Sequence, residues 1–375
     1  MKIAMFGHKR IPSREGGVEI VVEELSTRMA ARGHDVTCYN RMGRHIGGAG
    51  HAPDTENICP GVKIRRVPTI DRKGLAAVSS SFFAAVACAF SVADVVHIHA
   101  EGPAFMCWLP RLFGKRVVVT IHGLDWQRQK WSGGFGAKFI HWGEKMAVRY
   151  AHEIIVLSEN VRDYFLEIYG RETVHIPNGV VRPELRPAEE ITRQYGLEKD
   201  GYILFLGRLV PEKGVHYLIQ AFRDVKTGKK LVIAGSPSDS SGYGRELEAL
   251  AREDDRILFT GFVQGRLLEE LYSNARVYVL PSDLEGMPLS LLEAMSYGCC
   301  CLVSGIPECA EVVGNSGKTF PKGDIRALAG QLQILCEDDT EVASIRSGAA
   351  DFITGKYSWE ETVQRTLEVY RGNKQ

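Results

Sequence analysis

The chain has 375 residues, of which 45% are hydrophobic and 25% charged, and these proportions exclude a disordered, collagenous or fibrous protein. Its length suggests about two domains, each able to bury an ordinary core. The 46 basic and 46 acidic side chains cancel, but residues 1–177 carry 23 basic and 17 acidic ones, an excess too small to indicate a nucleic-acid-binding protein.

Short β-branched runs alternate with helical patterns through the first half of the chain. The expected strands are residues 2–6, 35–40, 62–67, 94–99, 116–122 and 153–158. A helical pattern follows the first strand from about residue 17 to residue 32, and Gly33 ends it. Runs of this kind are typical of strands buried on both faces of a parallel sheet, so the order predicts a doubly wound α/β domain.

The segment 75–93 has no charged residue and approaches the length of a membrane-spanning helix, about 20 residues. It also contains four serines and many alanines, which keep its mean hydropathy modest. We therefore expect a buried helix here, with a helix that touches a membrane as the alternative.

The same pattern starts again after a turn at 177–179 and a proline- and charge-rich stretch at 182–200. The strands expected in the second half are residues 202–207, 230–234, 256–260 and 276–280, and the last helical pattern covers 359–370. The sequence thus predicts an α/β protein with two Rossmann-like doubly wound domains that face each other across a cleft and meet near residue 180. Ligands in such sheets lie beyond the carboxyl ends of the strands, so the loops after the strands are the places to look for a site.

Nine cysteines are present, three of them consecutive at 299–301, without a CxxC pair or a metal-ligand spacing. We interpret them as small buried hydrophobic residues in a reducing compartment, and we expect no metal site. The first residues begin a strand at once, so no signal peptide is evident and a cytoplasmic location is expected.

Two loops have the composition of phosphate-binding loops. After the first strand, Gly16 and Gly17 open a helix whose N–H groups could meet an anion, although the loop lacks the GxGxxG spacing and an ordinary turn remains the alternative. In the second half, Gly207 and Arg208 end a strand and Lys213 follows five residues later. This cation pair could clamp a diphosphate, and a solvated surface is the alternative.

Two carboxylates flank the start of a helix near residue 288. Glu285 and Gly286 lie in the loop after the strand 276–280, and Glu293 lies one to two turns into the helix that follows. Both carboxylates can face one pocket and accept hydrogen bonds from sugar or ribose hydroxyls. The alternative is a solvated pair in which Glu285 only interacts with the helix dipole.

Taken together, these motifs resemble the family-4 retaining glycosyltransferases of the GT-B fold, in particular the bacterial members that build cell-surface polysaccharides. The resemblance rests on Gly16-Gly17, on Gly207-Arg208 with Lys213-Gly214, on the Glu-x7-Glu pattern of Glu285 and Glu293, and on the stretch 121–126 (IHGLDW). It covers residues 1 to about 365. It implies an N-terminal acceptor-binding domain at 1–180, a C-terminal donor-binding domain at 181–354, and a last helix, 355–375, that packs back on the first domain.

The resemblance also implies a role for each motif residue. Arg208 and Lys213 would neutralise the donor diphosphate, Glu285 and His122 would contact the transferred sugar, and Glu293 would hold the ribose. Backbone groups of Gly16, Gly17, Gly207, Gly286, Met287, Pro288 and Leu289 would contact phosphate and sugar, and Val263 would contact the base. As a lone residue after a strand, His122 would otherwise be interpreted as structural.

The implied reaction is retaining transfer of a hexose-type sugar from a nucleoside-diphosphate sugar to a glycan acceptor, lipid-linked through polyprenyl diphosphate. No cofactor is required. A UDP-sugar is the first choice of donor, with a GDP- or dTDP-sugar as alternatives. Because no DxD motif is present, cations would replace a metal, and front-side attack would replace a protein nucleophile.

The acceptor and the membrane would meet the basic residues of the first domain. These are Arg41, Arg44, Arg65, Arg66, Arg72, Arg128 and Lys130, with Trp126 and Trp131 among them. They would suit contact with the inner face of the cell membrane, and a solvated basic face is the alternative. A nucleotide-sugar epimerase or hydrolase on the same fold, and a non-catalytic subunit that binds sugar nucleotides, remain alternative functions.

Overall fold

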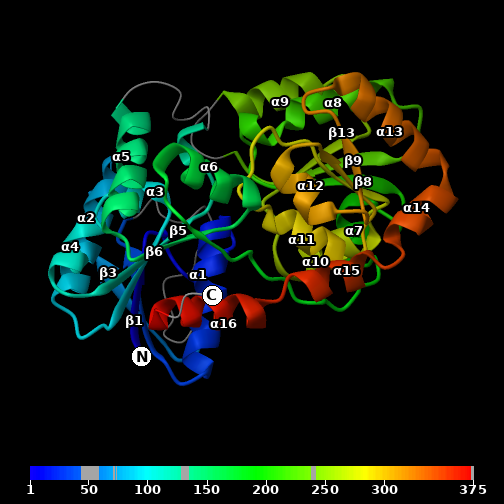
Figure 1. The fold of residues 1–375 in the computed structure, drawn as a ribbon. Helices are drawn as coiled ribbons and strands as arrows, with labels where there is room; N and C mark the ends of the chain where they lie inside the picture. The colour runs from blue at the N-terminus through cyan, green and yellow to red at the C-terminus, as the bar shows by residue number, and fades with distance from the viewer. Residues whose placement is uncertain (44–58, 71, 73, 128–134, 238–241, 373–375) are drawn as a thin grey trace. The chain divides into compact units, whose positions relative to one another are not determined.

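The computed structural model describes residues 1–43, 59–70, 72, 74–127, 135–237 and 242–372. The chain divides into two compact units, which we call unit 1 (Met1–Asn178 with Trp359–Gln375) and unit 2 (Gly179–Ser358). Each unit contains one parallel sheet with helices around it (Figure 1). The expectation of two parallel α/β sheets is therefore confirmed.

Unit 1 is built on a seven-stranded sheet in the order β3-β2-β1-β4-β5-β6-β7. The strands are β1 (Lys2–Phe6), β2 (Asp35–Arg41), β3 (Val62–Val67), β4 (Val95–His99), β5 (Arg116–Ile121), β6 (Glu153–Val156) and β7 (Val174–His175). The chain runs outward from β1 to β3 and then returns to β4, which pairs with β1 in parallel. The loops after β1 and β4 therefore meet at the point where the strand order reverses.

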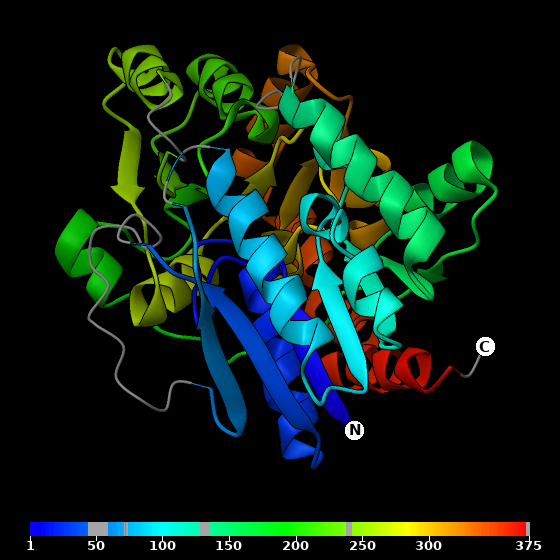
Figure 2. The same ribbon diagram turned by 90° about the vertical axis from the view of Figure 1, so that its left-hand side faces the viewer.

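The helices of unit 1 cover both faces of this sheet. They are α1 (Gly17–Ala31), α2 (Leu75–Ala89), α3 (Glu101–Ala104), α4 (Trp108–Leu112), α5 (Phe135–Tyr150), α6 (Glu159–Tyr169) and α16 (Trp359–Arg371), with a 3-10 turn η1 (Asp125–Gln127). Figure 2 shows α2 in front of the sheet, with α1 and α16 behind it. The last helix, α16, packs on α1, where Arg28 and Arg32 both pair with Glu360.

Unit 2 has a six-stranded sheet in the order β10-β9-β8-β11-β12-β13. Its strands are β8 (Tyr202–Leu206), β9 (Lys230–Ala234), β10 (Ile257–Gly261), β11 (Val277–Leu280), β12 (Cys301–Ser304) and β13 (Lys318–Phe320). Its helices are α7 (Glu190–Tyr195), α8 (Val215–Asp224), α9 (Tyr243–Ala251), α10 (Gly265–Asn274), α11 (Leu289–Ser296), α12 (Pro307–Val313), α13 (Ile325–Glu337), α14 (Asp339–Arg346) and α15 (Ala349–Lys356), with a 3-10 turn η3 (Pro211–Lys213). Here the strand order reverses between β8 and β11, which pair in parallel with Tyr278 beside Leu204.

Three short strands, β7, β12 and β13, were not predicted; they have two to four residues each. The cysteine-rich run is part of this correction, since Cys301 begins β12. All nine cysteines are buried and unpaired, which confirms their interpretation as hydrophobic core residues. Burial raises the pKa of these thiols, to about 12 for Cys299 and Cys300.

The uncharged segment at 75–93 forms α2, which is buried on one face only. Ala84, Ala85 and Cys88 lie in the core, whereas Phe82, Phe83 and the residue after the helix, Phe90, are exposed. The expectation of a buried helix thus holds for half of its surface. Among the residues that the structure describes, no helix is both long and apolar enough to span a bilayer.

Candidate functional site

A largely buried ion pair in unit 2 joins the loops after β8 and β11. The Nζ atom of Lys213 lies 2.6 Å from Oε1 of Glu285, and the Ser282 hydroxyl donates to the same oxygen, also over 2.6 Å. Both charged side chains are largely buried. The pair stands at the carboxyl edge of the sheet, where the strand order reverses, which is the ligand-binding position of open α/β sheets.

The backbone holds these two loops against each other. Gly214 has a φ of +66°, and a Cβ atom there would lie 2.0 Å from the carbonyl oxygen of Pro281, so only glycine allows this approach. A second link is the Asp283 N–H, which donates to the Glu212 carbonyl over 2.8 Å. Lys213 and Glu285 are thus placed by rigid backbone, and their contact does not depend on flexible side chains alone.

Glu293 lies in the second turn of α11, on the helix that follows Glu285. The Tyr272 hydroxyl donates to its Oε2 over 3.1 Å, and the Tyr278 hydroxyl lies 2.9 Å from Ser290 Oγ. Burial is the main cause that raises the pKa of Tyr278, and the charges of both Glu285 and Glu293 add to it. The two carboxylates therefore act on one buried hydroxyl.

The other predicted donor residues of unit 2 lie along the same edge. Arg208 is exposed in the loop after β8, and Gly207 is packed so closely that a Cβ on neighbouring Gly235 would lie 1.8 Å from its carbonyl oxygen. Gly286, Met287 and Pro288 are buried, Leu289 begins α11, and Val263 is buried just after β10. Because the strands are parallel, these loops share the carboxyl edge of the sheet with the Lys213–Glu285 pair.

In unit 1, the predicted phosphate loop contains a carboxylate. Gly16 is the N-cap of α1, and Gly17 is its first residue. Glu19 is buried in the first turn, where its Oε1 accepts a hydrogen bond from the Lys9 N–H over 2.8 Å. A Cβ on Gly16 would lie 2.3 Å from Glu19 Oε2. An anion that approached this helix end would therefore meet Glu19, which the sequence interpretation overlooked.

His122 follows β5 and belongs to a histidine cluster. Its Nε2 lies 3.1 Å from Nδ1 of His99, which ends β4, and two residues earlier His97 contacts Tyr370 of α16 and Thr120 Oγ1, each at 2.6 Å. His8, just after β1, is buried against Asn40 Oδ1 at 2.9 Å. The signal for His97 and His99 was present in the sequence as two histidines two residues apart, which places both on one face of a strand.

Burial keeps His8, His97 and His99 neutral. It lowers the pKa of His97 to about 3 and that of His8 to about 4, and it holds the pKa of His99 well below its ordinary value. For His8 the Glu19 carboxylate partly opposes this shift, while Arg41 reinforces it. At neutral pH these three histidines can therefore donate or accept hydrogen bonds, but they supply no positive charge.

Only some of the residues expected to meet an acceptor belong to the part of the chain that the structure describes. Arg65 and Arg66 are exposed on β3, and Arg41 donates to the Gly7 carbonyl over 3.3 Å. Arg44, Arg128, Lys130 and Trp131 lie outside the described residues. Within the part of the chain that the structure describes, no group of three or more His, Cys, Asp or Glu side chains is arranged to hold a metal ion.

Two family models match the chain. Residues 15–182 match "Glycosyltransferase Family 4", and residues 200–338 match "Glycosyl transferases group 1". An uncharacterized glycosyltransferase of Methanocaldococcus jannaschii is 27% identical over 99% of this chain and 98% of its own length. The O-antigen chain mannosyltransferase B of Escherichia coli is 29% identical over 49% of this chain and 50% of its own.

The fold also matches solved structures. The HepE protein of Anabaena, solved in complex with UDP-glucose, superposes with a TM-score of 0.80 at 18% identity, covering 99% of this chain and 100% of that one. At this level of identity the likeness concerns the fold.

Proposed function

The chain belongs to the group 1 and family 4 glycosyltransferases and has their GT-B fold, and from this premise we propose a specific reaction. It is the metal-independent, retaining transfer of a hexose-type sugar from a nucleoside-diphosphate sugar to a lipid-linked glycan in cell-surface polysaccharide synthesis. The observation that carries the proposal is the buried Lys213–Glu285 pair at the point where the strand order of unit 2 reverses. The kinship to an O-antigen mannosyltransferase supports this type of acceptor.

Lys213 and Glu285 would divide the recognition of the donor between them. An ammonium group has three N–H donors, so Lys213 can hold Glu285 and a phosphate oxygen together. Glu285, oriented by Lys213 and Ser282, would accept a hydrogen bond from a sugar hydroxyl. Glu293, oriented by Tyr272, would accept from the ribose. The backbone of Val263 would meet the base.

The reaction needs stabilisation of the charge that develops on the departing diphosphate. Lys213 and Arg208 would supply it, because fixed charges in a site with little water are most effective where charge appears in the transition state. Glu285 is committed to two hydrogen-bond donors, which makes it a poor nucleophile. We therefore propose attack by the acceptor hydroxyl on the same face of the sugar that the phosphate leaves, with its proton passing to the phosphate.

Nucleotide binding gives the first test of this function. We expect thermal unfolding of the purified protein to shift upward with UDP, with or without magnesium, and to shift less with GDP, dTDP or ADP. A hundredfold excess over Kd stabilises the folded state by ~2.7 kcal/mol. The HepE complex with UDP-glucose supports UDP as the nucleotide to try first. The absence of a shift with all four nucleotides would refute a preformed donor site.

An assay with radiolabelled UDP-sugar separates transfer from the alternative reactions. Incubation with a polyprenyl-diphosphate-linked glycan should yield a labelled lipid, whereas incubation of donor alone should leave it nearly unchanged. A new sugar nucleotide or rapid release of free sugar without acceptor would instead indicate an epimerase or a hydrolase. Binding without turnover for every acceptor would indicate a non-catalytic subunit.

We further propose that unit 1 docks on the inner face of the cell membrane. Its α2 and α4 pack together and expose an apolar face, which we define as Phe82, Phe83, Phe90, Leu112 and Phe113. Phe90 is 72% exposed and Leu112 70%, and the Phe90 and Phe113 rings are 4.7 Å apart. Arg111 and Lys115 adjoin this face in the sequence, so an anionic bilayer suits it better than a neutral one.

Vesicle sedimentation tests this docking. We expect the protein to bind vesicles that contain phosphatidylglycerol, and Phe90→Ser with Leu112→Ser to weaken binding about tenfold or more, because each removes a large apolar side chain from the bilayer. Leu185→Ser in unit 2, which removes another exposed leucine, is the matched control and should have no effect. Equal binding by the unchanged protein, the double variant and Leu185→Ser would contradict the assignment of the apolar face as the docking surface.

A further inference from the structure

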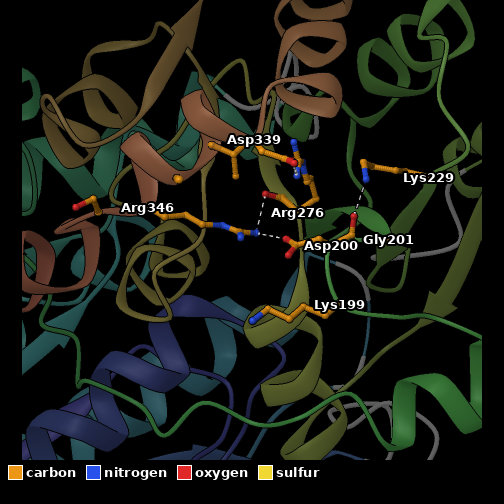
Figure 3. A pocket seen from close by; sticks show the side chains of 10 residues that line it. Lys199, Asp200, Gly201, Lys229, Arg276, Asp339 and Arg346 are labelled. Atoms are coloured by element: carbon orange, nitrogen blue, oxygen red, sulfur yellow. Dashed lines mark hydrogen bonds and ion pairs between the residues drawn. The ribbon is translucent and has the colours of Figure 1, made fainter.

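A cavity of about 800 Å³ opens at the amino edge of the unit 2 sheet, opposite to the Lys213–Glu285 pair. Gly201, Lys229 and Arg276 immediately precede β8, β9 and β11, and because these strands are parallel they all begin at the same edge. The other wall belongs to α14, through Val342, Ala343 and Arg346 among others. Figure 3 shows that the long basic side chains of this cavity come from several separate elements.

The cavity is basic although its half of the chain is acidic. It is lined by four cationic side chains and two carboxylates, namely Lys199, Lys229, Arg276 and Arg346 with Asp200 and Asp339. Residues 178–375, by contrast, carry 23 basic and 29 acidic side chains. A concave surface lined by an excess of one charge concentrates the opposite charge. The expected ligand is therefore an anion.

Arg276 points to the kind of anion. The residue is 6% exposed; its Nε donates to the Leu335 carbonyl over 2.9 Å, and its Nη1 pairs with the Asp339 carboxylate. Its Nη2, however, is buried without any hydrogen-bond partner. A buried N–H that lacks an acceptor is unfavourable and uncommon, and a phosphate can accept two parallel hydrogen bonds from one guanidinium.

The Asp339 carboxylate pairs with only one of the two Nη groups of Arg276. Its side chain is 88% exposed, and the neighbouring guanidinium lowers the pKa of its carboxyl group. An exposed carboxylate on a solvated helix end can turn away into water at little cost, since exposed ion pairs contribute little. A phosphate that replaced it would gain both Nη groups of Arg276.

Of the other basic residues, Arg346 holds the backbone in place, and Lys199 and Lys229 form what we call the rim of the cavity. Arg346 Nη2 donates to the Ala275 carbonyl over 2.6 Å, to the Arg276 carbonyl over 3.1 Å and to Asp200 Oδ1 over 2.6 Å, so it fixes the chain segment that carries Arg276 (Figure 3). Lys229 Nζ donates to the Asp200 carbonyl over 2.9 Å, and Lys199 is exposed. Both lysines can add N–H donors to a bound anion.

We infer that this cavity binds a phosphorylated small molecule, with the phosphate on Arg276 in place of the Asp339 carboxylate. Its volume exceeds what a phosphate fills, and Val342 and Ala343 provide an apolar wall for an organic part. Because it lies at the edge of the sheet opposite to the proposed donor site, its ligand does not compete with the sugar nucleotide. The inference stands independently of the reaction proposed above.

The test is calorimetric titration of the full chain with inorganic phosphate and, separately, with phenyl phosphate. All titrations use a Lys213→Ala background, which weakens phosphate binding at the other edge of the sheet. Lys199→Gln with Lys229→Gln should raise the Kd about tenfold, because two cations are removed from the rim. Asp339→Asn should lower the Kd about three- to tenfold, because the competing carboxylate is gone.

A structural role for Arg276 alone would not produce this pair of opposite changes. Tighter binding of phenyl phosphate than of inorganic phosphate would support an organic ligand, and equal binding would contradict the organic part of the inference. The inference is overturned if neither anion binds in the Lys213→Ala background. It is equally overturned if binding occurs but neither the lysine variant nor Asp339→Asn changes its Kd.

Discussion

Replacement of Lys213 or of Glu285 by alanine is expected to reduce sugar transfer by about 10²–10³-fold, the range found when one preorganised electrostatic contact is removed from an active site. Lys213→Ala removes the charge proposed to stabilise the departing phosphate, and it also leaves Glu285 buried without its cation. Glu285→Ala removes the proposed acceptor for the sugar hydroxyl and releases Lys213. Initial rates at saturating donor, with the labelled lipid as product, measure both effects.

The double variant shows whether Lys213 and Glu285 act as one unit or contribute separately to the rate of transfer. Because the two side chains touch, their effects should not add, and Lys213→Ala with Glu285→Ala should be little worse than the poorer single variant. Lys318→Ala, which breaks another ion pair of unit 2, that with Glu341, is the matched control and should keep nearly full activity. If both active-site variants remain within threefold of the unchanged protein, the proposed site is wrong.

The stability of unit 1 is expected to fall as the pH drops below about 6.5. His8 and His97 stay neutral in the folded state down to a pKa of about 4 and about 3, whereas in the unfolded chain they take up protons near their ordinary pKa of 6.5. Below pH 6.5 the unfolded state therefore binds more protons, so acid favours unfolding. Each histidine should contribute a slope of about 1.4 kcal/mol per pH unit between pH 6.5 and its folded pKa.

Tryptophan fluorescence can follow this unfolding in unit 1 alone. All five tryptophans lie there, at positions 108, 126, 131, 142 and 359. Urea unfolding between pH 7 and pH 5 should show the predicted slope, and His97→Gln should reduce it by about 1.4 kcal/mol per pH unit. Ile98→Val, a buried neighbour on the same strand, should lower stability at every pH without changing the slope. An unchanged slope in His97→Gln would contradict the role of its burial.

Much of the architecture could be predicted from the order of hydrophobic runs. Strands buried on both faces have a continuous apolar pattern, so β1 and β9 were placed at their observed bounds. The more exposed β3 was also placed at its observed bounds, and the other predicted strands lie within one or two residues of theirs. Short strands carry too few residues for such a pattern, as β13 with only Lys318–Phe320 shows. The exposed half of α2 was missed for another reason: alanine and phenylalanine do not reveal which side of a helix meets a neighbour.

The residues of the candidate site were found more readily than their contacts. Glu285, Glu293, Arg208 and Lys213 stand out because charged groups follow apolar strands. The sequence interpretation paired Lys213 with Arg208 and Glu285 with Glu293, whereas the structure joins Lys213 to Glu285 across 72 residues of chain. The functional roles of all four residues remain predictions, and the variants above test those of Lys213 and Glu285.

The sequence by itself determined that this chain forms two parallel α/β sheets and which loops carry its charged motifs, since local patterns of apolar residues and glycines are sufficient for that. Only the tertiary structure decided which charges meet. The pairing of β8 with β11 brings Lys213 beside Glu285, and the packing of α14 on the opposite edge brings Asp339 to Arg276. The physical reason is that strand order is set by packing of the whole sheet, so groups distant in the chain become neighbours in a way that no local pattern records.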